Sequence, residues 1–472
     1  LADRVHEFLD GRRDRIRRQQ RARAELSLAR ERLRACEETE GRSRELASEL
    51  ELVAPVPWAS TEEKSRFWEA EDHYERTLES AELHRERALQ HLLRAREDAP
   101  EDPEIRDALT EVYLERLDRA ELLGDRFQQR FLETQLRGLD LPNLEELLEG
   151  KGSLSIRVEP TPTRRTLAPL VEQHRVWVPA EEERIELRDA GAIALAQGRY
   201  ELRVEAEGRR RILVPVRIRR RATVELDLRL RTDDDIGAEF VQIPAGSFVM
   251  GGDDETFQSH PRQVRDVGEF AIARYPITFE EYREFVQSVA DVDPEEAEPL
   301  LPHVSENRNV WGIDDGRVLY FETRRNWPVF GVDFEQAQRY CQWRSQRDGR
   351  RYRLPTDEEW EKAARGTDER IFPWGDRFDA SFCKNAESTE GKAQPEAVGA
   401  YPIDCSPYGV RDMAGGIREW CDSWYSEKDG QRLVRGGSWN FTSIGAHCAY
   451  RMGCAPHVAY PFIGFRIVHD FG

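Results

Sequence analysis

The chain has 472 residues, more than one hydrophobic core usually organises, so we expect several domains. Charged residues make up 34% of it and the formal net charge is −20, which excludes a general electrostatic attraction to nucleic acid or to anionic lipid. No run of about eighteen apolar residues occurs and the start lacks a signal-peptide pattern, so we expect a cytoplasmic protein with no membrane segment.

Two basic segments, Arg12–Arg23 and Arg209–Arg221, are short and lie among acidic residues. We favour a solvated helix face and an exposed strand rim over a nucleic-acid site for them. The 7 cysteines show no Cys-x-x-Cys spacing, which predicts free thiols rather than a zinc site or a disulfide framework.

Residues 1–150 are rich in Arg, Glu, Leu and Ala and are broken by Pro55, Pro57, Pro100 and Pro103, a pattern typical of long helices with short breaks. Two apolar helical faces flank Pro100. They consist of Trp68, Ala70, Tyr74, Leu78, Ala81, Ala88 and Leu92 before it and of Ile105, Leu109, Val112, Tyr113 and Leu117 after it. The spacing resembles a tetratricopeptide-like (TPR-like) hairpin, which implies a scaffold that binds a protein partner. The alternative is a helical linker that packs on itself.

The opening residues, from Leu1 to Asp14, resemble the junction that follows the C-terminal lobe of bacterial serine/threonine kinases. This resemblance implies a kinase domain upstream, in a longer protein. The chain itself has no Gly-rich phosphate loop and no His-Arg-Asp motif, so we expect no kinase activity of its own.

Residues 151–232 alternate apolar and polar side chains in short runs that end at turn signals such as Gly191 and Gly198. This pattern predicts a small all-β, antiparallel sandwich. The run Gln197–Val204 resembles the signature of PEGA-type domains, which are small bacterial β modules. Because the segment has no cluster of His, Cys or carboxylates, we expect a spacer or a binding module.

Residues 238–472 are rich in Trp and Gly and carry a series of ordered motifs. They are Phe240–Gly251, Tyr275–Tyr282, Arg353–Glu361, Tyr408–Trp420, Arg435–Asn440 and Gly464–Arg466. Together they resemble the formylglycine-generating-enzyme (sulfatase-modifying factor) family, which implies an α+β, C-type-lectin-like fold. The predicted fold class is therefore multidomain, with an all-α front, a small all-β sandwich and this C-terminal domain.

Several of these motifs have a structural interpretation. Thr356 followed by Glu359 predicts a capped helix start with Trp360 facing the core. Gly436 and Gly437 allow backbone angles closed to other residues. Four tryptophans are expected to fill the core: Trp374, Trp420, Trp424 and Trp439.

Calcium is the metal ion that the resemblance implies, held by oxygen ligands from the Tyr408–Trp420 motif. The matching residues are Asp412 and Glu419 through their side chains and Ala414 and Ile417 through their carbonyls, with Asn385 for a second site. Gly416 stands where the family usually has asparagine.

Copper is disfavoured by the same resemblance. Catalytic family members hold copper with two cysteines, and counting from Ser438 their positions fall at Phe441 and near Ser443. A pair of Cys448 and Cys454 is the alternative, but two unlinked thiols are favoured. The histidines of the helical front are isolated, which disfavours the iron site of related sulfoxide synthases.

The segment from Trp439 to Tyr460 is almost uncharged in a strongly charged chain. It resembles the variable region of C-type-lectin-fold proteins that retroelements diversify. We expect it to be a partner-binding surface centred on Phe441, His447, Tyr450, Met452, His457 and Tyr460.

The sequence thus predicts a bacterial, non-catalytic recognition protein in a signalling or defence assembly. Its protein partner would be contacted through the C-terminal surface and the helical front, and neither nucleic acid nor a membrane is expected as a partner. The alternative is a copper- or iron-dependent oxidase acting on a cysteine peptide or a small thiol.

Overall fold

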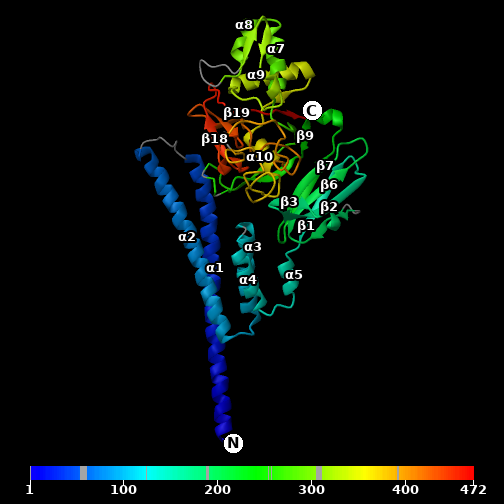
Figure 1. Ribbon diagram of the computed structural model, residues 1–472. Helices are drawn as coiled ribbons and strands as arrows, with labels where there is room; N and C mark the ends of the chain where they lie inside the picture. The colour runs from blue at the N-terminus through cyan, green and yellow to red at the C-terminus, as the bar shows by residue number, and fades with distance from the viewer. Residues whose placement is uncertain are drawn as a thin grey trace. The chain divides into compact units, whose positions relative to one another are not determined.

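Figure 1 shows the computed structural model of the chain, which describes residues 2–53, 61–123, 125–187, 191–253, 255–256, 258–303, 311–390 and 393–471. They form two structural units, Leu1–Leu148 and Glu149–Gly472. Throughout the described ranges, every helix is too short or too polar to cross a membrane.

The first unit is helical, as the sequence predicts. Its helices are α1 (Ala2–Val53), α2 (Thr61–Asp98), α3 (Pro103–Leu123), α4 (Arg126–Arg137) and α5 (Leu144–Glu149). Helices α1 and α2 are antiparallel, because Arg21 in α1 pairs with Asp98 at the end of α2 at 3.1 Å. Arg85 in the middle of α2 is buried and pairs with Glu40 of α1.

Most side chains of the two predicted apolar faces are buried. They are Ala81, Ala88 and Leu92 on α2 and Ile105, Leu109, Val112, Tyr113 and Leu117 on α3. Leu78 differs from the prediction, because it is 41% exposed. The break at Pro55 and Pro57 lies outside the described residues, and the resemblance to a TPR-like hairpin stays a prediction.

The second unit begins with a β region. Its strands are β1 (Gly152–Glu159), β2 (Arg164–Gln173), β3 (Val176–Pro179), β4 (Ile185–Glu186), β5 (Ile193–Leu195), β6 (Gly198–Glu205), β7 (Ile212–Ile218) and β8 (Thr223–Arg229). One sheet has the order β5-β1-β8 and the other β3-β2-β6-β7 with β4 beside β2. β1 and β8 are parallel, which differs from the predicted all-antiparallel pairing. Side chains of both sheets share one core, including Leu154, Leu202 and Leu228.

A larger domain rich in β-strands follows the short helix α6 (Asp233–Ile236). Its strands are β9 (Phe240–Ile243), β10 (Gly246–Met250), β11 (Gln263–Val267), β12 (Phe270–Ala273), β13 (Gly312–Asp314), β14 (Arg317–Leu319), β15 (Tyr352–Arg353), β16 (Arg418–Ser426), β17 (Gln431–Arg435), β18 (Arg451–Cys454), β19 (Ile463–Gly464) and β20 (Val468–Asp470). Its helices are α7 (Phe279–Ala290), α8 (Pro294–Ala297), α9 (Phe334–Asp348) and α10 (Asp357–Arg365).

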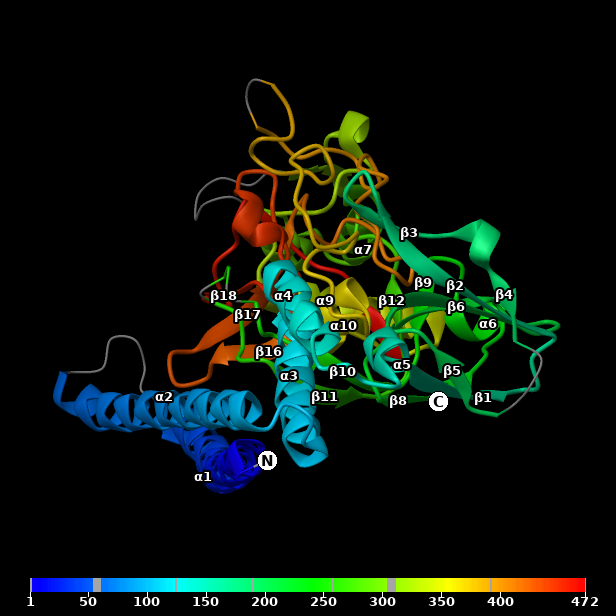
Figure 2. The ribbon, with the colours of Figure 1, turned by 90° about the horizontal axis from the view of Figure 1, so that it is seen from below.

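Two four-stranded sheets organise this domain, with the orders β15-β20-β12-β9 and β18-β17-β16-β19. In the second sheet β18 pairs antiparallel with β17, and β17 with β16 (Figure 2). The last strand of the chain, β20, lies between β15 and β12, so chain order and sheet order differ. This places residues more than a hundred positions apart in direct contact.

The structural motifs behave largely as predicted. The Thr356 side chain accepts a hydrogen bond from the Glu359 N–H, and Glu359 accepts one from the Thr356 N–H, so the expected capping box is present. Trp360 is buried beneath it, as are Trp374 and Trp420. Trp424 is not a core residue, because it is 40% exposed and stacks on an arginine instead.

The β region contacts the C-terminal domain through specific residues. Arg199 on β6 pairs with Asp376 at 2.7 Å and stacks over the Trp177 ring. The backbone N–H of Trp177 donates to the Trp374 carbonyl at 2.9 Å. These contacts use the edge of strand β3, which would otherwise present unpaired backbone groups.

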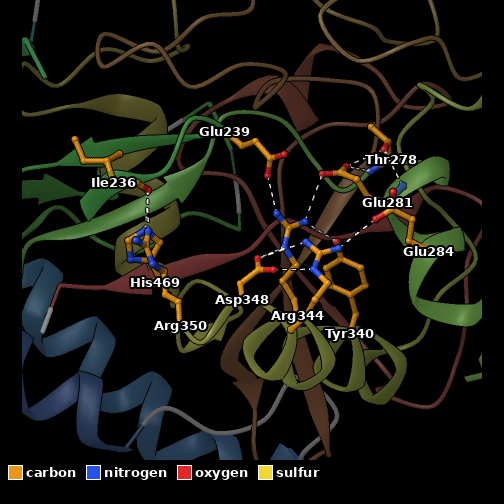
Figure 3. Close-up of polar contacts among 11 residues, drawn as sticks. Ile236, Glu239, Thr278, Glu281, Glu284, Tyr340, Arg344, Asp348, Arg350 and His469 are labelled. Atoms are coloured by element: carbon orange, nitrogen blue, oxygen red, sulfur yellow. Dashed lines mark hydrogen bonds and ion pairs between the residues drawn. The ribbon is translucent and has the colours of Figure 1, made fainter. Parts of the chain in front are cut away.

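Arg344 on α9 is the centre of a second set of polar contacts (Figure 3). Its guanidinium donates to Asp348 and to Glu239, each at 2.7 Å, and to the hydroxyl of Tyr340 at 3.3 Å. Glu281 of α7 lies 3.9 Å away. Arg344 is largely buried, and the surrounding carboxylates compensate its charge.

The linker into the C-terminal domain is fixed beside this network (Figure 3). Nη1 of Arg350 donates to the Ile236 carbonyl at 3.2 Å, and Nε2 of His469 lies 2.9 Å from the same oxygen. Burial lowers the pKa of His469, and the charge of Arg350 lowers it further, so this imidazole is held neutral.

Candidate functional site

The segment that the sequence singles out connects two neighbouring strands of the second sheet. It leaves β17 at Arg435, passes through the 3₁₀ helix η4 (Ser443–Ala446) and returns as β18. Gly436 starts the connection with φ +80°, and a Cβ on Gly437 would lie 2.2 Å from the Ala414 carbonyl oxygen. Only glycine fits at these two positions, as expected from the sequence.

Arg418, the first residue of β16, lies beneath this segment. The residue is 1% exposed, and its Nη1 donates to the Gly436 carbonyl at 3.1 Å. Its guanidinium carbon lies 4.4 Å from the ring centre of Phe441 and 4.9 Å from that of Tyr450. Nη2 is buried and has no hydrogen-bond partner. Burial lowers the pKa of Arg418, and the smaller effects of Tyr450, including a hydrogen bond to its side chain, and of Cys454 act in the opposite direction.

Of the six predicted recognition residues, four reach the surface. His457 is exposed, whereas Phe441, Met452 and Tyr460 are half-buried. Phe441 lies against Tyr450 with 5.9 Å between ring centres, and Tyr460 packs on Phe462. The structure therefore brings Phe441 together with Tyr450 over Arg418.

His447 and Tyr450 differ from the expectation, because both are buried. Nδ1 of His447 lies 2.7 Å from Asp253, and the His447 ring meets the edge of Phe372. The hydrogen bond from His447 holds the pKa of Asp253 below its usual value, against the effect of burial. The side chains of His447 and Asp253 thus stabilise the interior of the domain. A partner cannot contact His447 unless the domain opens.

The residues predicted to bind calcium already have other partners. Both carboxylate oxygens of Glu419 accept hydrogen bonds at 2.6 Å from Arg466, and one accepts a further bond from Trp360. The side chain of Asn385 donates to carbonyls of its own loop, at Ala380 and Cys383. Calcium needs six to eight converging oxygens, and a cationic arginine occupies the position beside Glu419.

Asp412 lies in a small acidic cavity of about 10 Å³ next to the fully buried Asp404. The Asp404 carboxylate accepts bonds from the N–H groups of Met413 and Ala414. Burial and the nearby Asp412 raise the pKa of Asp404 to about 8, and burial raises that of Asp412 to about 6. In the part of the chain that the structure describes, no group of three or more His, Cys, Asp or Glu residues could hold a metal ion. Calcium binding by Asp412, Glu419, Ala414, Ile417 and Asn385 stays a prediction.

The cysteines near the segment are buried free thiols. Cys448 packs with Trp360 and Leu433, whereas Cys454 packs in a different core cluster with Trp420. Burial raises the pKa of Cys454 to about 12 and that of Cys448 further still. A thiol of this kind stays protonated at neutral pH as long as no metal ion displaces the proton.

Sequence reasoning missed three features of this site. Arg418 appeared only as part of the Tyr408–Trp420 motif, and the sequence did not show that it is buried without an acidic partner. Arg466 appeared only as part of the closing Gly-Phe-Arg motif, 47 positions from Glu419. The pairing of His447 with Asp253 spans 194 positions and leaves no local signal.

Comparisons with known proteins agree with the resemblance drawn from the motifs. The family model described as the sulfatase-modifying factor enzyme 1-like domain matches residues 230–471. The inactive C-alpha-formylglycine-generating enzyme 2 of Bos taurus is 31% identical over 272 residues, covering 49% of this chain and 88% of the bovine protein. The hercynine oxygenase of Mycolicibacterium smegmatis is 31% identical over 268 residues, covering 49% of this chain and 61% of that protein. The formylglycine-generating enzyme of Thermomonospora curvata is 27% identical over 239 residues, covering 43% and 77%. The chain belongs to the family of the sulfatase-modifying factor enzyme 1-like domain.

Proposed function

We propose that this chain is a non-catalytic recognition protein, in which the family's domain binds a protein ligand. One observation carries the proposal. The two positions to which the resemblance assigns the copper-binding cysteines fall at Phe441 and near Ser443, and neither side chain is a ligand for Cu(I).

The neighbouring thiols support the same conclusion. Cys448 and Cys454 are free, buried thiols that lie in different core clusters. The name of the bovine relative describes an inactive protein, which is consistent with a binding role for this fold.

The proposed ligand-binding surface consists of Phe441, Met452, His457 and Tyr460. They reach the surface from the connection and strand that follow β17, and aromatic side chains of this type are common at the centres of protein interfaces. We further propose that the protein works in a bacterial signalling or defence assembly, with the helical unit as a second partner surface. A kinase domain upstream and a diversified C-terminal segment belong to the same proposal.

The test compares this proposal with the oxidase alternative, which the hercynine oxygenase and formylglycine-generating enzyme among the relatives favour. The full chain is incubated anaerobically with Cu(I), desalted, and assayed for bound copper and for oxygen uptake with a cysteine-containing peptide. We expect no stoichiometric copper and no oxygen uptake above that of the Cys448→Ser and Cys454→Ser variants. Copper-dependent oxygen uptake that either substitution abolishes would overturn the proposal.

A further inference from the structure

Four buried arginines of the C-terminal domain illustrate how this protein stabilises an interior positive charge. Arg466 pairs with Glu419 at 2.6 Å and Arg370 with Asp368 at 2.8 Å. Arg435 pairs with Asp357 and Glu361, and Arg344 with Asp348 and Glu239. Each therefore has at least one carboxylate within ion-pair distance, which is the usual condition for burying a guanidinium.

Arg418 breaks this pattern. It is as deeply buried as Arg435 and Arg466, but among the described residues it forms no ion pair with a carboxylate. Its Nη1 donates to the Gly436 carbonyl, and the neighbouring rings of Phe441 and Tyr450 attract the cation weakly. Its Nη2 donates to nothing. A buried donor on a charged group that lacks its partner is expensive, so it is expected where a ligand supplies the missing acceptor.

We propose that Arg418, together with Phe441 and Tyr450, forms a binding site for a carboxylate of the protein ligand. This inference rests on the proposed recognition function and names the chemistry that the surface recognises. The carboxylate is either an aspartate or glutamate side chain or the free C-terminus of the ligand. It accepts a charge-assisted hydrogen bond from Nη2 and replaces the missing counter-charge of Arg418.

A carboxylate fits better than a phosphate group. Arg418 offers the two N–H groups of Nη2 and a single positive charge that no carboxylate compensates, which matches a monoanion. A phosphate carries more negative charge than one guanidinium compensates. The Tyr450 ring beside the guanidinium suits the apolar part of the acidic residue.

Phe441 is the movable cover of the site. It is half-buried, whereas Tyr450 is buried and fixed against the sheet. Gly445 leaves room for the Phe441 ring, because a Cβ added at Gly445 would lie 2.8 Å from that ring and 3.5 Å from Nη2 of Arg418. We expect a change of the Phe441 side-chain rotamer to open Nη2 towards the surface without moving the strands.

The experiment titrates the full chain with three short probe peptides by calorimetry and thermal shift. One is N-acetyl-Gly-Glu-Gly-amide, one is its neutral Gln analogue, and one is N-acetyl-Gly-Gly-Gly with a free carboxylate. We expect at least one acidic probe to bind about 10-fold or more tightly than the neutral one, as for charge-assisted hydrogen bonds. The stronger of the two acidic probes identifies the source of the carboxylate.

Three variants locate the effect. Arg418→Met should abolish the difference between acidic and neutral probes, and Phe441→Ala should increase the affinity for the acidic probe by removing the cover. Arg432→Met is the matched control, because Arg432 lies on the neighbouring strand and stacks on Phe334 and Trp424 but has Asp422 as a partner at 3.5 Å. It should bind as the unaltered chain does.

Equal binding of acidic and neutral probes, or acid-selective binding that survives Arg418→Met, would overturn this inference. Neither result would affect the proposed recognition function, which the copper and oxygen measurements decide. Copper-dependent turnover would overturn the recognition function whatever the probes do.

Discussion

At the scale of single residues, the C-terminal domain depends on charges that are buried and paired. Arg435 is fully enclosed between Asp357 and Glu361, and both acids are themselves buried. Arg418 has equal burial without such partners. Replacing the arginine with methionine should therefore change the free energy of unfolding in opposite directions at the two positions.

Replacing Arg418 with methionine is expected to raise the free energy of unfolding by about 1–3 kcal/mol, because an uncompensated buried charge is replaced by an apolar chain of similar shape. Replacing Arg435 with methionine should lower it by about 3–5 kcal/mol, since two buried carboxylates lose their partner. Urea unfolding of both variants measures the difference. Equal destabilisation of the two would show that Arg418 is compensated in the folded protein.

The imidazole of His469 predicts a pH dependence of stability. Its folded-state pKa is lowered from 6.5, so its contribution is present above that pH and is lost as the pH falls through the folded value. In the variant His469→Gln, whose amide can still donate to the Ile236 carbonyl, this loss should be absent. Unfolding free energies measured from about pH 7.5 to about pH 5 should therefore fall more steeply for the unaltered chain. Parallel curves would contradict the assignment of a neutral, buried His469.

At the scale of elements, close approaches of the backbone fix the connection between β17 and β18. Gly437 lies so close to the Ala414 carbonyl that any side chain would displace one of the two loops. Gly268, between β11 and β12, has no heavy atom within 4 Å of an added Cβ and no positive φ. Substitutions at Gly437 and at Gly268 therefore separate the effect of a close backbone contact from the effect of replacing a glycine as such.

Gly437→Ala is expected to destabilise the domain by about 2 kcal/mol or more, as overpacking does. Gly268→Ala should be neutral or slightly stabilising, because it reduces the conformational freedom of the unfolded chain. Thermal unfolding of the two variants provides the comparison. A tolerated Gly437→Ala would mean that the Ala414 loop can move aside at little cost.

Local elements could be predicted from the sequence, and long-range pairings could not. The capping box at Thr356 and the glycines at 436 and 437 have signals within a few residues, and each is present. The burial of His447 depends on Asp253, and the engagement of Glu419 depends on Arg466; no local pattern encodes either contact. The motif that suggested the calcium ligands shows the residues but not their distant partners, and calcium binding stays a prediction.

At the scale of the whole molecule, the described residues separate into a helical unit and a unit that joins the β region to the C-terminal domain. The second unit is connected by charged contacts, among them Arg199 with Asp376 and Arg219 with Glu369 at 2.5 Å. Thr367 also donates its hydroxyl to the Pro215 carbonyl at 2.5 Å. The β region should therefore unfold together with the domain that follows it.

Calorimetry of the full chain is expected to show one transition for each unit. A shortened chain that starts at Glu149 should keep the transition of the second unit at the same midpoint temperature. Arg199→Ala combined with Arg219→Ala should lower that midpoint or split the transition in two. A β region that melts separately in the unaltered chain would contradict this coupling.

The placement of Arg466 also constrains the order in which the domain can be completed during synthesis. Its side chain donates to the carbonyls of Ala273 and Arg411 as well as to Glu419, and the strand after it is inserted between β15 and β12. All of these partners are translated earlier. Until residue 466 and the strand after it leave the ribosome, Glu419 remains an unpaired acid and the first sheet has a gap. The nascent domain must therefore remain incomplete until Arg466 and strand β20 have been translated, which makes this segment the point at which folding of the domain commits.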